Sequence, residues 1–306
     1  MTAIWLKLKR QLVLLLLLKL RLLRLVQRLS SKVLSLLLLL AALTLAVLAP
    51  AFHYHQFGEA TRMARDAGLS ALLIGGTVFS VSAAVRSMRR ELESGTAAVA
   101  LSHPVSRAQF FLAKACGAYA AFALFAVALG AVTATMVNGA AIGAEVARKT
   151  GDIPRLWGPS YAFGVAAVVA PYVIGAVLNR AANFRFCLSA FVSAVVIALS
   201  GVAYRPDRVE LLRLLPAVAL LWIPPAFFVA AAAAAAVRLK TNAATAISAL
   251  LVAGFIPFAG NYCLSEALSR DGWIPMSYVA FAALAALPAI LAAVVAGLAL
   301  MRTRDV

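Results

Sequence analysis

The stretch AQFFLAKACGAYAAFALFAVALGAVTATMV, residues 108–137, decides the class of fold and has a single Lys as its only charged residue. A membrane span needs about 20 mostly apolar residues, and backbone groups in lipid must hydrogen-bond within their own segment. Ser106 and Gln109 have the spacing of a capping box, so we predict a helix from Ser106 to about Val137. At about 1.5 Å per residue this helix is about 48 Å long. The hydrocarbon core is only about 30 Å thick, so the first turns should project into water.

Other long apolar runs predict an all-α, polytopic transmembrane helix bundle that forms one domain, residues 33–306. Hydrophobic residues make up 64% of the chain and charged residues 13%, which excludes an ordinary soluble domain. The predicted spans are Val33–Phe52, Ala67–Val85, Ala108–Val137, Pro159–Asn179, Phe186–Ala203, Leu214–Val237, Ala243–Gly260 and Pro275–Met301. The connections at Arg180–Arg185 and Arg238–Lys240 are very short, so six spans with re-entrant pieces are the alternative to eight. Prolines inside the runs should kink the helices.

Lys and Arg are unevenly divided between the two sides of such a bundle. With the amino terminus inside, the inside segments hold 19 bases and three acids, and the outside loops hold nine bases and eight acids. Positive charge near span ends marks the cytosolic side, so we expect both termini in the cytosol. The membrane that we expect is the cytoplasmic membrane of a bacterium. Topology then accounts for the net charge of +17, and no soluble basic domain for nucleic acid is predicted.

Residues 1–32 form a separate basic region with eight bases, no acids and many leucines. Arg21, Arg24, Arg28 and Lys32 recur every three or four residues, so they share one helical face. We expect an amphipathic elbow helix in the inner membrane interface, with its bases toward anionic headgroups. A low-complexity basic leader is the alternative. A cleaved signal peptide fits less well, because the region is too long and too charged.

The sequence contains no motif that predicts chemistry within this chain. Ion-coupled carriers place ionisable groups at membrane depth, but the predicted spans carry none there. The P-loop pattern GxxxxGK[ST] and the metalloprotease pattern HExxH are absent. Three cysteines form no CxxC pair. The group His53, His55 and Glu59 fits a solvated loop better than a metal site, because residues two apart do not share a helix face. We therefore expect no catalytic, cofactor or metal residues and an energy source outside the chain.

A charged island, RRELESGTAAVALSHPVSRAQFFLAK, residues 89–114, separates two of the apolar runs. We predict a short helix over Met88–Ser102, held parallel to the membrane and stopped at His103-Pro104, because the residue before proline avoids helix. Its two acids would face a partner. In the alternative, Glu91 and Glu93 only balance nearby arginines on a solvated face, since i,i+3 and i,i+4 pairs are common on helices.

The island resembles the signature of the ABC-2 type permeases, the membrane subunits of type V ABC exporters. The matching pattern is Glu91-x-x-x-Gly95-Thr96, Pro104-x-Ser106-Arg107 and Lys114-x-x-Gly117. The elbow region and the closing span ending in Met301-Arg-Thr-Arg are also similar to that family. The signature covers about 27 residues, and eight apparent spans depart from the family's usual six.

The resemblance implies that residues 86–107 form a coupling segment that docks on a separate ABC ATPase subunit, which would hold the ATP and Mg²⁺. It also implies a second permease copy, identical or different. The residues carried over as ATPase-coupling are Glu91, Glu93, Gly95, Thr96, Pro104, Ser106, Arg107 and Lys114. The expected function is that of a permease subunit of an ATP-driven exporter. The alternative is a non-transporting membrane scaffold that anchors an enzyme complex. Apolar spans with scattered Ser, Thr and Asn suit lipids, lipid-linked glycans and hydrophobic drugs equally.

Overall fold

The computed structural model describes residues 40, 41, 44, 47, 60–97, 106–151, 158–183, 186–204, 208–259 and 274–303. Every regular element in these ranges is a helix, and they contain no strand. The helices are α3 (Ala60–Glu93), α5 (Arg107–Thr150), α6 (Gly158–Ala182), α7 (Phe186–Tyr204), α8 (Arg208–Leu220), α9 (Ile223–Arg238), α10 (Thr241–Ala259) and α12 (Met276–Arg302). The all-α prediction is confirmed for this part of the chain.

Five segments are long and apolar enough to cross a membrane, which supports the assignment as a membrane protein. They are Thr61–Glu93, Arg107–Thr150, Tyr161–Ala182, Leu212–Arg238 and Met276–Arg302. Shorter apolar helices cover Leu188–Tyr204 and Ala243–Phe255. The predicted elbow helix and most of the predicted first span, residues 33–52, lie outside the described residues.

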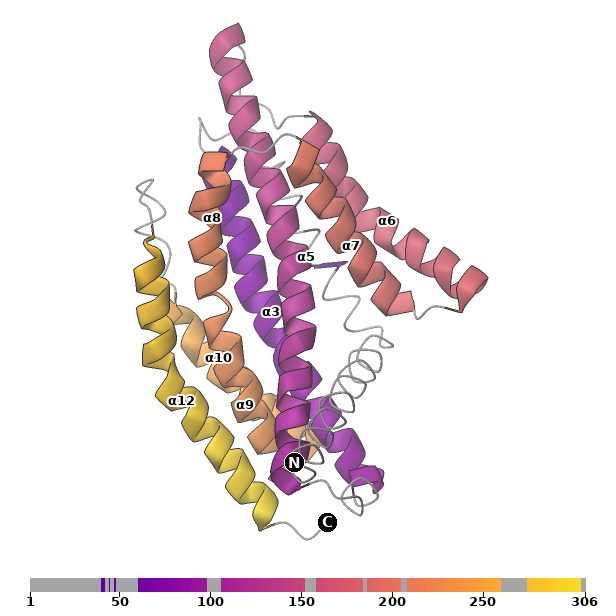
Figure 1. Ribbon diagram of the computed structural model, residues 1–306, viewed down its shortest axis with the longest axis vertical. Coiled ribbons are helices and arrows are strands. Elements are labelled where there is room, and N and C mark those ends of the chain that lie inside the picture. The colour runs from indigo at the N-terminus through magenta and orange to yellow at the C-terminus, as the bar shows by residue number, and fades with distance from the viewer. Residues whose placement is uncertain are drawn as a thin grey trace, which may run out of the picture.

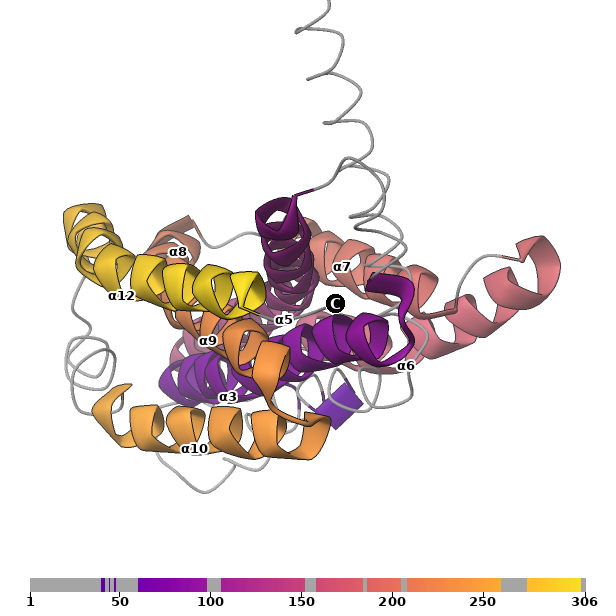
Figure 2. The ribbon, with the colours of Figure 1, turned by 90° about the horizontal axis from the view of Figure 1, so that it is seen from below.

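Helix α5 is the central pillar of the bundle (Figure 1). It packs against α3, α6, α7, α8, α9 and α12. Its 44 residues give it a length of about 66 Å at 1.5 Å per residue, so it extends well past a hydrocarbon core of about 30 Å. Seen along the bundle, α10 and α12 lie on different sides of α9, and α6 and α7 extend away from them (Figure 2).

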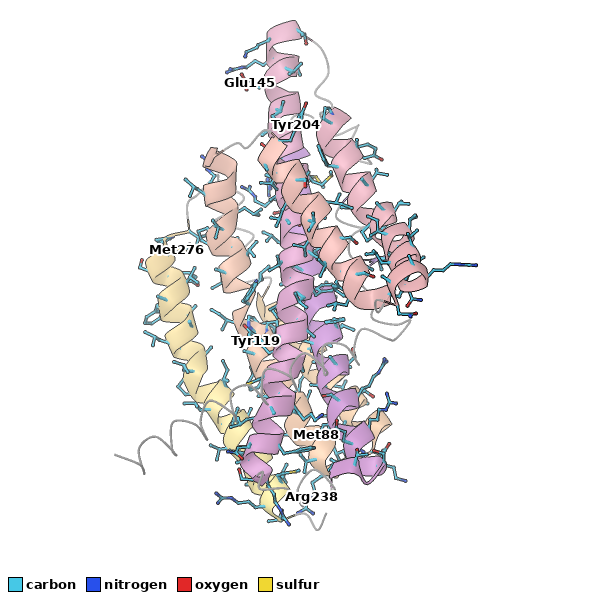
Figure 3. The ribbon with its side chains drawn as sticks, turned by 45° about the vertical axis from the view of Figure 1, so that its right-hand side comes forward. Met88, Tyr119, Glu145, Tyr204, Arg238 and Met276 are labelled. Carbon is cyan, nitrogen blue, oxygen red and sulfur yellow. The ribbon has the colours of Figure 1, made fainter. Side chains whose placement is uncertain are left out.

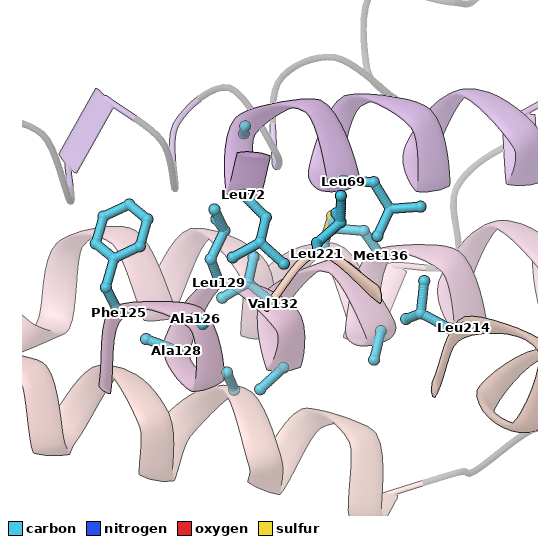
Figure 4. Packing of buried hydrophobic residues seen from close by; sticks show 14 of the residues in the cluster. Leu69, Leu72, Phe125, Ala126, Ala128, Leu129, Val132, Met136, Leu214 and Leu221 are labelled. Atoms are coloured by element: carbon cyan, nitrogen blue, oxygen red, sulfur yellow. The ribbon is translucent and has the colours of Figure 1, made fainter. Parts of the chain in front are cut away.

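Helices α3 and α5 approach closely because glycine faces the partner helix. A Cβ atom at Gly68 would lie 2.2 Å from the side chain of Thr133, and one at Gly76 would lie 2.7 Å from the Phe122 ring. Small residues let helices in lipid come close enough for extensive van der Waals contact. Figure 4 shows the apolar side chains that fill this contact, including Leu72 on α3 and Leu129 on α5.

The core is divided into two clusters along the bundle. One cluster is centred on Leu72, Phe122 and Leu129. The second lies toward the end where α3, α9 and α12 finish and α5 and α10 begin, and it includes Met88, Phe111, Ala236 and Met301. We call that end the basic end, because it carries Arg86, Arg89, Arg90, Arg107, Lys114, Arg238, Lys240 and Arg302. Figure 3 shows Met88 and Arg238 there, Glu145 at the opposite end and Tyr119 between them.

The predicted span over 214–237 is a broken helix. Helix α8 ends at Leu220 and α9 begins at Ile223, directly before Pro224 and Pro225. Proline has no N–H to donate to the preceding turn, so the helical ladder stops there. The Tyr119 hydroxyl of α5 donates a hydrogen bond of 2.9 Å to the Trp222 carbonyl oxygen at this break. The predicted kink at these prolines is therefore confirmed as a full interruption.

Helix α7 is fixed to α5 by a hydrogen bond inside the apolar layer. The single proton of the Thr135 hydroxyl is shared between two acceptors, the carbonyl oxygen of Ala131 in its own helix at 2.9 Å and that of Ala198 in α7 at 3.0 Å. A Cβ atom at Gly201 would lie 2.8 Å from Thr135 Cγ2 and 2.9 Å from Phe163 Cβ in α6. The three helices therefore cross at one tightly packed point.

We expect Gly68→Ala to destabilise the bundle, because the new methyl group would overlap Thr133 and force α3 from α5. Overpacking of this kind costs about 1–3 kcal/mol. The control is Gly254→Ala in α10, where no described atom lies within 4 Å of the added Cβ and alanine favours helix over glycine. Thermal unfolding in detergent should show a lower midpoint for Gly68→Ala and an unchanged or higher midpoint for Gly254→Ala. Equal midpoints for the two variants would contradict the close α3–α5 contact.

Candidate functional site

The island emerges from the bundle at the end of α3. Helix α3 is continuous from Ala60 to Glu93, so the prediction of a separate short helix beginning at Met88 is wrong for Met88–Glu93. The physical reason is that Met88 is fully buried in the second core cluster, so packing continues the helix beyond the apolar run. Residues 98–105, with Pro104, lie outside the described residues.

Residues 93–96 form an exposed tip where α3 ends. Gly95 has φ +70°, a left-handed conformation that glycine adopts without steric cost and that commonly ends helices. The Ser94 amide donates to the Arg90 carbonyl oxygen at 3.1 Å, and the Ser94 and Thr96 hydroxyls lie 2.8 Å apart. Among the described residues, a Cβ atom at Gly95 would meet nothing within 4 Å. The tip is therefore shaped by its own hydrogen bonds, and residues 93–96 are exposed.

Glu91 and Lys114 join the end of α3 to the first turns of α5. Lys114 Nζ lies 2.5 Å from Glu91 Oε1, and the side chains of Lys114 and Glu91 are 11% and 19% exposed. Lys114 also lies over the Phe110 ring, 5.6 Å from its centroid. Removal of either partner of such a largely buried ion pair destabilises the fold, because the other charge is left uncompensated. The pair makes the ends of α3 and α5 a single braced unit.

Glu93 has a weaker role in the fold. Arg89 Nε lies 2.9 Å from Glu93 Oε1 in an i,i+4 pair, in which the Arg89 side chain is 11% exposed and the Glu93 side chain is 54% exposed. Because the Glu93 carboxylate stays in water, this pair is screened more than the Glu91–Lys114 pair. Within the chain, Glu93 only balances a nearby arginine, as the alternative interpretation of the island predicted. Its exposed carboxylate can still contact a partner.

The capping box predicted for α5 is confirmed. The Gln109 amide donates to Ser106 Oγ at 3.2 Å, and the Ser106 amide donates to Gln109 Oε1 at 3.0 Å. The box fixes the start of α5 and places Arg107 at its first helical position. Helix α5 therefore has a defined beginning at the basic end of the bundle.

Two arginines hold the end of α12, a contact that sequence reasoning missed. Arg107 Nη1 donates to the carbonyl oxygens of Arg302 at 2.9 Å and Met301 at 3.4 Å. Arg238 Nη2 donates to Thr303 Oγ1 at 2.5 Å and to the Thr303 carbonyl oxygen at 3.3 Å. The last carbonyl groups of a helix lack partners in the helix and carry partial negative charge, which explains the attraction. Basic residues are common near the carboxyl ends of helices, but no sequence pattern indicates that Arg107 contacts a helix almost 200 residues away.

Buried polar residues at the opposite end were also missed. Arg65 in α3 is 3% exposed and Asn138 in α5 is 1% exposed. The sequence pattern placed Arg65 in an outside loop, whereas α3 extends over it. Charged groups in such positions need polar neighbours, and both residues have polar or electrostatic interactions. The candidate metal group His53, His55 and Glu59 lies outside the described residues.

The structure thus sorts the seven predicted site residues that it describes into three groups. Glu93, Gly95 and Thr96 lie on the exposed tip. Glu91 and Lys114 form the brace beneath it. Ser106 and Arg107 set the start of α5 and its link to α12. The arrangement presents a small polar surface on two rigid helix ends, which is suited to binding a partner.

A double-mutant cycle should distinguish the brace from the surface pair. For Glu91→Gln, Lys114→Met and the double variant we expect a coupling of about 1–2 kcal/mol in the free energy of unfolding, because contacting charged residues couple within about 0.5–3 kcal/mol. The matched cycle, Glu145→Gln with Lys149→Met, whose side chains are 54% and 68% exposed, should give below about 0.5 kcal/mol, as exposed i,i+4 pairs do. Both are measured by unfolding in mixed micelles. A coupling for Glu91 and Lys114 no larger than that of the control would show that the brace does not join the helices.

No protein family model matches the chain, and neither the curated proteins nor the solved structures contain a match. The functional interpretation therefore depends on the geometry of the basic end and on the sequence pattern of the island.

Proposed function

We propose that the chain is the membrane-spanning permease subunit of an ATP-driven ABC exporter, powered by a separate ATPase subunit. The observation that carries the proposal is the exposed tip at residues 93–96, supported by the Glu91–Lys114 ion pair. The tip is polar and open, while the residues directly beneath it are buried in the second core cluster. An ordinary solvated loop does not require such a brace.

The brace gives the tip a mechanical connection to the membrane region. A partner that displaces the tip displaces α3, because the tip continues directly from this helix. Helix α5 then follows, because Lys114 is bonded to Glu91 and because glycine contacts hold the two helices together farther along. Packed cores and interfaces do not deform continuously, so we expect the two helices to move as a unit. A small movement at the tip is therefore transmitted over the length of both helices.

The proposed partner is an ABC ATPase subunit that binds ATP and Mg²⁺. ATP binding would close a pair of ATPase subunits and move the two tips of a permease dimer, which is formed from identical or different copies within the lipid membrane. This movement would open or compress a path between the two copies. Direct docking contacts come from Glu93, Gly95 and Thr96. Glu91, Lys114, Ser106 and Arg107 support them from within the fold.

The first test is the identity of the protein that accompanies the chain. The full-length chain, purified from its native membranes in mild detergent, should carry a subunit with a GxxxxGK[ST] motif, identified by mass spectrometry. The rate of ATP hydrolysis by this complex should differ from the rate of the ATPase subunit without the chain. A copurifying enzyme that lacks an ATP-binding motif would support the scaffold alternative. A chain that is active in export without any ATP-binding subunit would contradict the proposal.

Charge reversal at the tip should impair the partnership without unfolding the chain. We expect Glu93→Lys to reduce the amount of bound ATPase subunit and the export rate, because Glu93 is exposed on the tip and its charge would face the partner. The matched control is Glu145→Lys at the opposite end of α5, which also removes an exposed i,i+4 pair, with Lys149. The control should bind and export normally. Normal binding and export by Glu93→Lys would show that the tip does not dock the ATPase.

The proposed orientation places the tip in the cytosol. In a chain whose native cysteines have been replaced, Ser94→Cys should be protected from a membrane-impermeant thiol reagent in intact cells and should react after the membrane is opened. Lys149→Cys at the far end of α5, where the Lys149 side chain is 68% exposed, should react in intact cells. The reverse labelling pattern would contradict both the positive-inside assignment and cytosolic docking.

A further inference from the structure

Helix α12 is attached to the bundle very differently at its two ends. In its most apolar 18-residue stretch no residue is buried, whereas 72% of the corresponding stretch of α5 is buried. The buried residues of α12 are Gly297 and Met301, both near the basic end. Helix α12 therefore lies on the outside of the bundle over most of its length and enters it at its final turns.

The final turns of α12 are fixed by both packing and hydrogen bonds. A Cβ atom at Gly297 would lie 2.2 Å from Phe111 Cζ, so the two helices touch at this glycine. Arg107 and Arg238 donate to the carbonyl oxygens at residues 301–303. Hydrogen bonds from charged donors are about twice as strong as neutral ones. This end of α12 moves with α5 and α9.

The opposite half of α12 has only apolar contacts with other helices in the part of the chain that the structure describes. Ile274, just before the helix, is buried in the first core cluster, and Val279 packs against that cluster. Lipid tails are as apolar as these side chains, so contacts of this kind can be exchanged for lipid at little cost in free energy. Phe281 and Leu284 are already 69% and 65% exposed.

Pro288 lies between the two halves. It removes the hydrogen bond that its N–H would donate to the carbonyl oxygen of Leu284 and weakens the helix at that turn. Pro171 in α6 and Pro216 in α8 also lie inside helices, but both are buried, whereas Pro288 is exposed. Neighbouring side chains restrain the backbone at Pro171 and Pro216. They do not enclose Pro288, and α12 changes direction along its length (Figure 1).

We propose that α12 is a hinged helix whose half at 276–287 swings about Pro288 away from α8 and the first core cluster, while the half at 289–303 stays fixed to α5 and α9. The swing opens the side of the bundle to the outer part of the bilayer. Its use as an exit for an apolar substrate rests on the proposed export function. The hinge itself does not, because it follows from the contacts of α12.

Distances between spin labels test the hinge without a partner or a substrate. The full chain, with its native cysteines replaced, is reconstituted in lipid nanodiscs with one label at Val127→Cys on central α5. The second label is at Phe281→Cys or at Ala299→Cys, on the two halves of α12, and all three positions are exposed. Double electron–electron resonance should give a broad or two-component distribution for the Phe281 pair and a single narrow one for the Ala299 pair.

Two sets of variants identify the hinge and its fixed end. Pro288→Ala restores the missing helix hydrogen bond, so it should remove the breadth or second component of the Phe281 pair and leave the Ala299 pair unchanged. Arg107→Gln combined with Arg238→Gln should broaden the Ala299 pair, whereas Arg90→Gln, an exposed base at the same end, should not. Two equally narrow distributions, or a broad Phe281 pair that Pro288→Ala does not narrow, would overturn the proposal. These outcomes leave the ATPase-docking tests unaffected, so failure of the hinge and failure of the export function are distinguishable.

Discussion

The close contact between α3 and α5 is the interaction on which the other contacts depend. In lipid, apolar side chains gain little from leaving the solvent, so helix association requires close van der Waals packing and interhelical hydrogen bonds. Gly68 and Gly76 provide the close approach, and the Glu91–Lys114 pair aligns the two helices at the basic end. The remaining helices are arranged around this pair: α7 through Thr135, α8 and α9 through Tyr119, and α12 through Phe111 and Arg107.

Much of the helical content could be predicted from apolar length alone. The predicted spans at 159–179, 186–203, 243–260 and 275–301 correspond to α6, α7, α10 and α12 within a few residues. The end of α5 could not be predicted, because Asn138, Gly139 and Gly143 interrupt the apolar run. Asn138 is nevertheless buried within the helix, so tertiary packing outweighs local propensity there. The prolines predicted a distortion between α8 and α9, but their positions in the sequence could not show at which residues one helix ends and the next begins.

At the candidate site, the sequence showed which residues belong to the site but not which residues they contact. Its order of charges identified the island, and the Ser106 capping box is local, so both could be predicted from neighbouring residues. The partner of Glu91 is 23 positions away, and the partners of Arg107 lie 194 and 195 positions away. Such pairings are set by how the helices stack, which depends on the close approach at glycines. The prediction of a short helix parallel to the membrane was wrong at Met88–Glu93 because helix stacking buries Met88 and so extends α3.

The helices of the bundle differ in the hydrocarbon thickness that their lengths match. Helices α3 and α5, with 34 and 44 residues, are longer than any ordinary hydrocarbon layer and can slide relative to it without exposing their ends to lipid tails. Helices α7 and α10 have 19 residues each, about 28 Å at 1.5 Å per residue, which is close to the hydrocarbon thickness itself. Hydrophobic mismatch costs fractions of a kcal/mol per Å. In a bilayer thicker than about 28 Å this cost would fall on α7 and α10, whose apolar stretches are shorter than the five segments long enough to cross a membrane, and not on α3 and α5.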